Sequence, residues 1–217
     1  VLPIVALVGT NNLSTAIIIL GIAVIVVFVS DKRYMQFVWI AAAGAGMMAL
    51  FLGMESYRLE RIAIWKNPEA YEKGYQTIQG LYAIGSGGLF GRGFGESIQK
   101  LGFVPEAQND MIFSIICEEL GFVGATILML VFLVLIWRFM VIAVHAPDLF
   151  GSLIAAGAMG HIAIQVILNV AVVTNTIPNT GITLPFISYG GTSVLFLLSE
   201  MGLVLAVSRW QSEKKCI

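Results

Sequence analysis

Long apolar runs without charge dominate the chain, and short polar connectors separate them. Five runs approach the length of about 20 residues that spans a hydrocarbon core of roughly 30 Å. They cover residues 13–29, 35–54, 112 or 120 to 144, 149–173 and 192–207. Apolar and polar positions do not alternate in them as in a membrane β-barrel strand, so each run predicts a transmembrane helix. The predicted fold class is an all-α integral membrane protein, a polytopic helical bundle.

The composition supports this fold class and excludes several others. Of the 217 residues, 58% are hydrophobic and 12% are charged, and the mean hydropathy is +0.90. These values exclude a soluble domain, a disordered chain and a secreted disulfide scaffold. The formal net charge of −1 leaves no basic excess to neutralise phosphates, so we expect no nucleic-acid partner.

Basic residues orient the predicted helices. The connector Ser30-Asp31-Lys32-Arg33, the lone Arg138 and the tail from Arg209 to Lys215 are basic, which marks these ends as cytoplasmic. The predicted organisation therefore has two transmembrane helices in 1–54, a large extracytoplasmic loop in 55–111, three transmembrane helices in 112–209 and a cytoplasmic tail in 210–217. The chain opens at Val1 without a methionine or a signal peptide, and we interpret it as a fragment.

The outer loop holds most of the polar chemistry. Nine of the thirteen acidic residues lie from Glu55 through Glu119. The segment Glu55–Lys66 has apolar residues three apart, which favours a short amphipathic helix on the membrane surface. Its Arg58 and Arg61 suit bidentate binding of a lipid diphosphate. Snorkelling toward the headgroups is an equally good interpretation of either arginine.

A glycine-rich segment follows in residues 85–96, and its first eleven residues, 85–95, include six glycines. It contains neither G-x-G-x-x-G nor a P-loop pattern, so a nucleotide site is rejected. So many glycines indicate backbone that turns sharply or approaches a ligand or a neighbouring helix. A flexible loop is the alternative interpretation.

Carboxylates gather where the loop enters the third predicted span. Glu106 and Asp110 are four residues apart and share a face if this turn is helical. Glu118 and Glu119 follow within three turns. Such a cluster could hold a divalent cation of unknown identity or provide a general base. An acidic helix cap is the simpler interpretation of any one of them.

Polar residues also lie inside the predicted membrane spans. His161, Gln165 and Asn169 are spaced i, i+4, i+8 and form one polar stripe. Glu200 sits at a similar depth in the last span, and an intramembrane carboxylate is costly enough to indicate a function. We hypothesise a contact between Glu200 and His161, with helix packing favoured over a proton relay.

Several motifs in order resemble one known family, the shape, elongation, division and sporulation family of FtsW, RodA and SpoVE. The motifs are Tyr57-Arg58-x-x-Arg61, Gly74-Tyr75-Gln76, Ala83-Ile-Gly-Ser-Gly-Gly88, Pro105-Glu-Ala-x-x-Asp110, Glu118-Glu-Leu-Gly-Phe122 and Leu184-Pro-Phe-Ile-Ser-Tyr-Gly-Gly191. The resemblance implies a ten-helix fold, of which these five helices are the second half. It also implies a peptidoglycan glycosyltransferase of the bacterial cytoplasmic membrane that polymerises lipid II beside a class B penicillin-binding protein.

The resemblance places the family's essential aspartate at Asp110, which would be the general base of an inverting transfer. A divalent cation or the arginines would stabilise the leaving diphosphate, and no organic cofactor is implied. Further candidates for substrate binding are Arg58, Arg61, Glu106, Gln165, Asn169, Ser188, Tyr189 and Gly190. The chain departs from the family's Pro-Asp-Leu-Gly-Thr motif, because it has Asn11-Asn12-Leu13-Ser14-Thr15 there.

Two other functions remain open at this point. A lipid II flippase would use the polar stripe as a headgroup pathway, and a noncatalytic scaffold for a transpeptidase would need only the helix surfaces. Both tolerate Asp110→Ala, which a polymerase does not. The residues do not distinguish division, elongation and sporulation, and we expect this 217-residue chain to be inactive alone.

Overall fold

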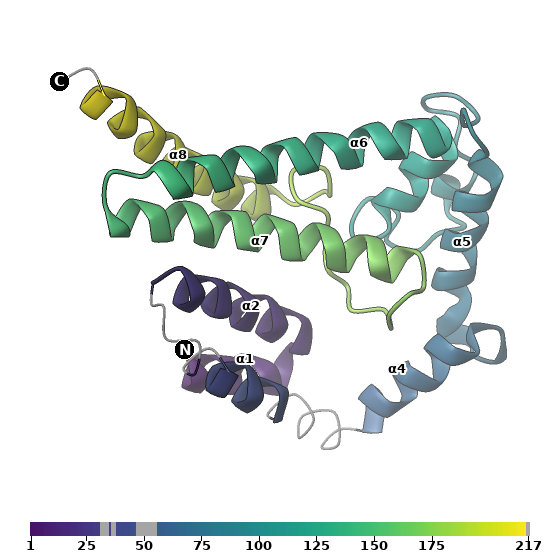
Figure 1. The fold of residues 1–217 in the computed structure, drawn as a ribbon. Helices are drawn as coiled ribbons and strands as arrows, with labels where there is room; N and C mark the ends of the chain where they lie inside the picture. Colours follow the sequence, from purple (N-terminus) through teal and green to yellow (C-terminus); the bar gives the residue numbers. More distant parts are fainter. Residues whose placement is uncertain (31–34, 36–37, 47–55, 216–217) are drawn as a thin grey trace. The chain divides into compact units, whose positions relative to one another are not determined.

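A computed structural model describes residues 1–30, 35, 38–46 and 56–215, and every regular element in this part of the chain is helical. Figure 1 shows the arrangement. The α-helices are α1 (Leu2–Asn11), α2 (Leu13–Ser30), α4 (Ser56–Lys66), α5 (Tyr75–Gly87), α6 (Ile112–His145), α7 (Leu149–Val173) and α8 (Gly191–Lys215). Three short 3₁₀ helices are η1 (Pro68–Ala70), η2 (Glu72–Gly74) and η3 (Gln99–Leu101).

Four of the described helices are long and apolar enough to cross a membrane: α2, α6, α7 and the Gly191–Gln211 part of α8. Four of the five predicted spans therefore correspond to helices of the expected length and apolar composition. Half of the remaining prediction, 35–54, lies outside the described residues, and within the described half residues 38–46 are helical. The amphipathic segment before residue 66 is also helical, as α4.

The short helix α1 was not predicted, and its end explains the unusual asparagine pair. The helix stops at Asn11 because Asn12 adopts extended backbone angles. The side-chain oxygen of Asn12 then accepts a hydrogen bond from the backbone N–H of Thr15 at 3.1 Å. This is N-terminal capping of α2, a role that asparagine performs well.

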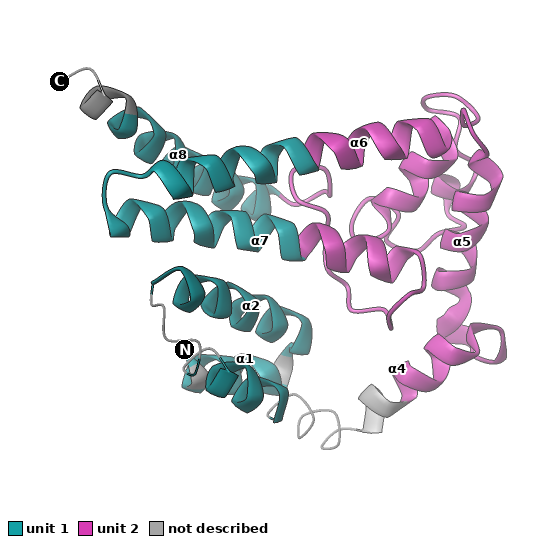
Figure 2. Cartoon of the chain, viewed as in Figure 1, with its two compact units in different colours: residues 1–51, 133–164, 191–217 teal, residues 52–132, 165–190 magenta. Residues whose placement is uncertain are grey.

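The chain divides into two compact units, coloured in Figure 2. The first unit comprises residues 1–51, 133–164 and 191–217. Within it, α2 and α7 approach closely, because Ile164 reaches into the space beside Gly21 and Ile25 reaches into the space beside Gly160. Small residues at such contacts are typical of packed membrane helices.

The second unit comprises residues 52–132 and 165–190. Its core includes Ala83 of α5, Val104, Met111 and Leu184, all buried. Helix α5 packs against the first turns of α6, and the contact is so close that a Cβ on Gly87 would lie 1.9 Å from the backbone oxygen of Cys117. This unit carries most of the polar residues singled out above.

The backbone of the glycine-rich segment lies against the backbone of α6 at a point where α6 is broken. At Gly121 the backbone leaves helical geometry, with φ 67° and ψ −169°. A Cβ on Gly121 would lie 2.3 Å from the backbone nitrogen of Gly91, and φ is positive at both residues. Only glycine fits two backbones this close. The expectation that this segment turns sharply and approaches a neighbouring helix is confirmed.

Candidate functional site

Asp110 lies in a turn that leads into α6. Residues 105–111 form consecutive turns, and Glu106 has a positive φ of 54°. The helical turn that would place Glu106 and Asp110 on one face is therefore absent from this segment. Asp110 is only 8% exposed, so the turn buries an ionisable group two residues before α6 begins.

Two distant segments hold this turn in place. Ser188 donates its hydroxyl to the backbone oxygen of Asn109 at 2.7 Å and accepts a bond from the backbone N–H of Leu184 at 2.7 Å. The backbone N–H of Tyr189 donates to the Gln108 carbonyl at 2.8 Å. The loop before α8 is thereby fastened to the residues that precede Asp110.

The side chain of Asn169 provides the second fastening, from within α7. Its amide nitrogen donates to the backbone oxygens of Asp110, at 2.8 Å, and of Ile182, at 2.7 Å. Asn169 is completely buried, so it joins three chain segments in the core of the unit. Buried carbonyls need such partners, because an unpaired one is costly.

Among the described residues, Gln76 of α5 is the side-chain donor to the carboxyl group of Asp110. Gln76 Nε2 lies 3.4 Å from Asp110 Oδ1 and 3.3 Å from the Pro105 carbonyl oxygen. The other end of the Gln76 amide accepts a bond from Asn179 Nδ2 at 3.2 Å. Gln76 thus links the carboxyl group to the loop that follows α7.

Burial raises the pKa of Asp110 above its usual value, and the negative charge of Glu106 raises it further. Bonds from the backbone N–H groups of Asp110 and Met111 and from Gln76 oppose this shift. The net direction is upward. A carboxylate whose pKa moves toward neutral pH is a stronger base than an ordinary surface aspartate.

Asp110 lines a cavity of about 280 Å³ that also contains two basic side chains. The lining residues are Arg61, Ile64, Trp65, Lys73, Gln76, Thr77, Asp110, Asn175, Asn179 and Gly181. Arg61 donates to the Asn179 carbonyl at 3.0 Å, and Trp65 Nε1 donates to the Asn175 carbonyl at 2.9 Å. These two bonds hold α4 against the loop that follows α7, so the cavity combines a buried acid with nearby cations.

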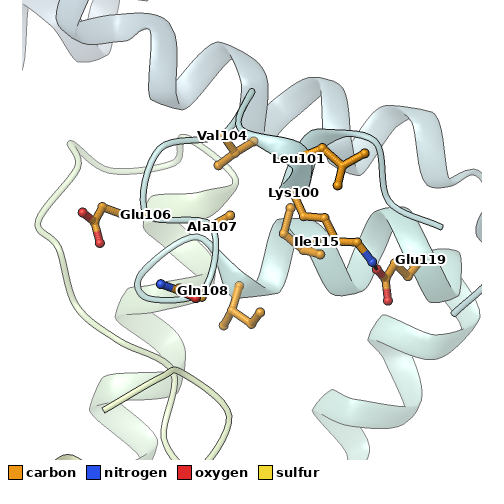
Figure 3. A pocket seen from close by; sticks show the side chains of 9 residues that line it. Lys100, Leu101, Val104, Glu106, Ala107, Gln108, Ile115 and Glu119 are labelled. Carbon is orange, nitrogen blue, oxygen red and sulfur yellow. Dashed lines mark hydrogen bonds and ion pairs between the residues drawn. The ribbon is translucent and has the colours of Figure 1, made fainter. Parts of the chain in front are cut away.

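A second cavity, of about 660 Å³, lies beside the same turn and is drawn in Figure 3. Its lining consists of Lys100, Leu101, Val104, Glu106, Ala107, Gln108, Ile112, Ile115 and Glu119. The Lys100 ammonium is directed at Glu119, 2.7 Å away. The backbone N–H of Gly95 also donates to the Glu119 carboxylate, at 3.0 Å.

Glu118 is occupied by a different set of partners. Its carboxylate is 1% exposed and accepts bonds from the hydroxyls of Ser97 and Ser86, the latter at 3.3 Å. The backbone N–H of Gln99 adds a bond at 3.2 Å, and Arg92 Nε lies 3.6 Å away. This buried carboxylate ties the segment after the glycines to α6.

The expectation of a carboxylate cluster was wrong for the described residues. Within that part of the chain, no three His, Cys, Asp or Glu side chains come together as a metal site would require. Glu118 and Glu119 are engaged with their own donors, and Glu106 lines the second cavity. Glu106 and Asp110 lie in the turns before α6, whereas Glu118 and Glu119 lie within the helix.

Inside the first unit, the predicted pairing of His161 with Glu200 is confirmed. His161 Nδ1 lies 2.9 Å from Glu200 Oε2, which joins α7 to α8. The other members of the polar stripe differ, because Asn169 serves the turn at Asp110, whereas the side-chain oxygen of Gln165 is buried without a partner. The polar stripe therefore does not act as one unit, because His161 pairs with α8 and Asn169 binds the turn at Asp110.

The remaining candidates differ in where they lie. Arg61 shares the cavity of Asp110, whereas the side chain of Arg58 lies outside the described part of the chain. Ser188 is a buried anchor, the Tyr189 side chain is 74% exposed, and Gly190 is half-buried. Sequence reasoning missed Lys73 and Gln76 as site residues. The motif Gly74-Tyr75-Gln76 was the available signal for Gln76.

Comparisons with known proteins give one consistent answer. The family model described as "Cell cycle protein", for FtsW, RodA and SpoVE, matches residues 1–213. Stage V sporulation protein E of Bacillus subtilis (strain 168) is 47% identical over 202 residues, covering 92% of this chain and 55% of that protein. A probable peptidoglycan glycosyltransferase FtsW of Trichlorobacter lovleyi is 41% identical over 204 residues, with 91% and 52% covered.

Two solved structures resemble the fold. One, from a study of the structural coordination of polymerization and crosslinking by a peptidoglycan synthase complex, has a TM-score of 0.75 at 31% identity, covering 96% of this chain and 59% of that one. The other is a variant of the rod shape determining protein RodA of Thermus thermophilus, with a TM-score of 0.64 at 30% identity, covering 96% and 54%. The chain thus spans about half the length of the curated relatives it matches.

Proposed function

Because the chain belongs to the FtsW/RodA/SpoVE family, we propose that it carries the catalytic part of a peptidoglycan glycosyltransferase that polymerises lipid II in the bacterial cytoplasmic membrane. Relatives of this family are named as probable peptidoglycan glycosyltransferases. The observation that carries the proposal is the cavity in which buried Asp110 lies among basic side chains. In this proposal the cavity faces the extracytoplasmic side.

The proposed reaction needs one base and one site for a leaving diphosphate. The hydroxyl oxygen of the acceptor sugar attacks the anomeric carbon of the donor, and the bond from that carbon to the lipid diphosphate breaks. The hydroxyl proton passes to the carboxylate of Asp110, which raises the nucleophilicity of the oxygen. A single displacement of this kind inverts the anomeric configuration. The raised pKa of Asp110 suits the role, because the carboxylate accepts a proton more readily.

The two basic side chains of the cavity support binding of the diphosphate. Arg61 and Lys73 both line the cavity with Asp110, and Arg61 can contact two phosphate oxygens at once. Arg58 lies three residues before Arg61 on the same helix, a spacing at which two residues are neighbours on the helix surface. Positive charge near the leaving group stabilises the negative charge that develops on it.

A divalent cation remains part of the proposal in a limited form. With no cluster of three carboxylates in the described residues, Asp110 is the acidic ligand available in this cavity. Magnesium is often held by one or two carboxylates together with substrate phosphates. A bound cation would supply charge neutralisation for the diphosphate, and no organic cofactor is proposed.

The other candidates position the base or the substrate. Ser188 and Asn169 hold the backbone on either side of the Asp110 turn, and the loop from Tyr189 to Gly190 continues from that anchor. Gln165 and Glu106 stay proposed contacts for the sugar and peptide parts of lipid II. A class B penicillin-binding protein is the proposed partner, since a resembling structure comes from a peptidoglycan synthase complex.

The decisive experiment measures lipid II polymerisation by the native-length protein with its penicillin-binding partner. We expect Asp110→Asn to abolish glycan strands while partner binding is kept, and Glu69→Gln, at an exposed position of η1, to leave them unchanged. The melting temperature of Asp110→Asn should equal or exceed that of the native protein at neutral pH. A raised pKa means that the folded state disfavours the charged carboxylate, and stability is lost as pH rises through that pKa.

Other outcomes would redirect the assignment. Undiminished polymerisation by Asp110→Asn would contradict the base and bring the flippase or the scaffold forward. Lipid II transport assays would then separate these two. Loss of activity together with a melting temperature lowered by several degrees would assign Asp110 a structural role.

A further inference from the structure

The glycine-rich segment presents apolar side chains to the surroundings, although it lies outside the helices. Leu89 is 65% exposed, Phe90 80% and Phe94 87%. Three large apolar side chains so close in sequence and so exposed form a surface that water disfavours. We call residues 88–95 the glycine loop. The proposed catalytic role of Asp110 does not require this surface.

Backbone hydrogen bonds tie the glycine loop to the break in α6. The N–H groups of Arg92 and Gly93 donate to the carbonyls of Glu118 and Glu119, at 2.9 and 3.0 Å. The break at Gly121 withdraws these carbonyls from the regular ladder of the helix. The loop therefore provides partners for backbone groups that the break in α6 would otherwise leave open.

In a second pair of hydrogen bonds, α6 is the donor and the glycine loop is the acceptor. The N–H groups of Phe122 and Val123 donate to the carbonyls of Gly88 and Leu89, at 2.9 and 3.0 Å. Non-helical backbone is tolerated at membrane depth only where its polar groups are satisfied within the protein. Four reciprocal bonds meet that condition at this joint.

The depth of the joint follows from the length of α6. About 20 residues cross the hydrocarbon core. Counting back that length from His145 reaches about residue 125, and counting back from Arg138 reaches about residue 118. Residues 121–123 lie between these limits, and the side chain of Phe122 is 67% exposed on the helix. The joint is therefore level with the edge of the hydrocarbon core at the Ile112 end of α6.

From these observations we propose that the glycine loop is a membrane-interface wedge, with Leu89, Phe90 and Phe94 immersed in the lipid of the leaflet at the Ile112 end of α6. The loop is bonded to a membrane-spanning helix at the edge of the core, and its exposed side chains are those that favour the interface. Arg92 also lies on the surface of the loop, although its Nε is 3.6 Å from the buried Glu118 carboxylate, so the apolar side chains carry the proposal. The wedge would hold the loop that carries Asp110 close to the bilayer surface.

The test uses single-cysteine variants of the native-length protein, in a background with Cys117→Ala and Cys216→Ser. Phe90→Cys and Phe94→Cys are labelled with nitrobenzoxadiazole and reconstituted in phosphatidylglycerol and phosphatidylethanolamine vesicles. Phe122→Cys is the reference for lipid contact. Glu72→Cys, at an exposed position of η2, is the reference for water. Quenching by doxyl-labelled lipid and by aqueous iodide is measured for each.

We expect the labels at positions 90 and 94 to be quenched by doxyl lipid about as strongly as the label at 122, and severalfold more than the label at 72. Strong iodide quenching without lipid quenching at 90 and 94 would overturn the proposal. Protection from both quenchers would overturn it as well, because another part of the protein would then cover the loop. The exposed positions tolerate cysteine, so each variant is expected to fold.

Discussion

The basicity of Asp110 is set by a few neighbours that act in opposite directions. Burial, followed by the charge of Glu106, raises the pKa of Asp110, whereas backbone N–H groups and the Gln76 amide lower it. The carboxylate form is the active form of a general base, so activity is lost as the pH falls through this pKa. The acidic limb of the pH profile should therefore lie above the value of about 3.9 of an unperturbed aspartate.

Substitution of these neighbours gives opposite shifts of the acidic limb. Gln76→Leu removes a donor that stabilises the carboxylate, so the limb should move to higher pH. Glu106→Gln removes a negative charge, so the limb should move to lower pH. The measurement is the rate of lipid II polymerisation across pH for both variants. Shifts in the same direction, or none in either variant, would contradict the role of Asp110 as the titrating base.

At the scale of elements, α5 and α6 are held together by a contact that only a glycine permits. A Cβ on Gly87 would lie 1.9 Å from the Cys117 carbonyl oxygen, whereas a Cβ on Gly85 would meet nothing within 4 Å. Gly87→Ala should therefore lower the melting temperature, as overpacking costs about 1–3 kcal/mol. Gly85→Ala in the same helix should raise it slightly, by up to about 1 kcal/mol of helix propensity. Equal effects would refute the close contact.

Asn169 connects elements in the same unit through its side chain. Asn169→Leu would leave the Asp110 and Ile182 carbonyls without their donor, at a cost of about 1–3 kcal/mol for each carbonyl. Gln165→Leu, one turn earlier, removes an oxygen that has no partner, so its cost should be much smaller. Thermal unfolding of both variants compares them directly. If Gln165→Leu lowered the melting temperature as much as Asn169→Leu, the two hydrogen bonds of Asn169 would not be the source of its stabilising effect.

The positions of most of the long helices could be predicted from the sequence. The runs at 13–29 and 149–173 match α2 and α7 to within one residue, and the run at 192–207 lies inside the longer α8, because hydropathy and length are local properties of a segment. The cap by Asn12 and the break at Gly121 could not be predicted. Each depends on backbone geometry that the apolar pattern does not encode.

At the scale of the whole molecule, the chain spans about half the length of its curated relatives. We predict that the 217-residue chain expressed alone does not polymerise lipid II, because the cavity at Asp110 would lack the rest of the predicted ten-helix bundle. The assay compares this chain with the native-length protein at equal amounts in the same membranes. Glycan strands made by the shorter chain would show that the described unit suffices.

The contact of His161 with Glu200 could be predicted by estimating from the sequence how deep each residue lies in the membrane. Both residues lie in membrane spans at similar depth, and an uncompensated carboxylate there is costly, so a partner at that depth was predictable. The structure confirms the contact at 2.9 Å. The same reasoning did not separate Asn169 from this pair, because periodicity places residues on one face but does not say which segment lies opposite.

The sequence by itself determined the membrane class, most of the long helices and the family, because these follow from local hydropathy and from ordered motifs. It also singled out Asp110 as the candidate general base. Only the tertiary structure decided the surroundings of Asp110. Its donor Gln76 is 34 residues away, and the bond of Arg61 to the Asn179 carbonyl spans 118 residues. Contacts between such distant segments depend on how the turns direct each side chain. For that reason the sequence did not show that the predicted carboxylate cluster is absent from the described residues. It also did not show that Lys73 and Gln76 line the cavity of Asp110.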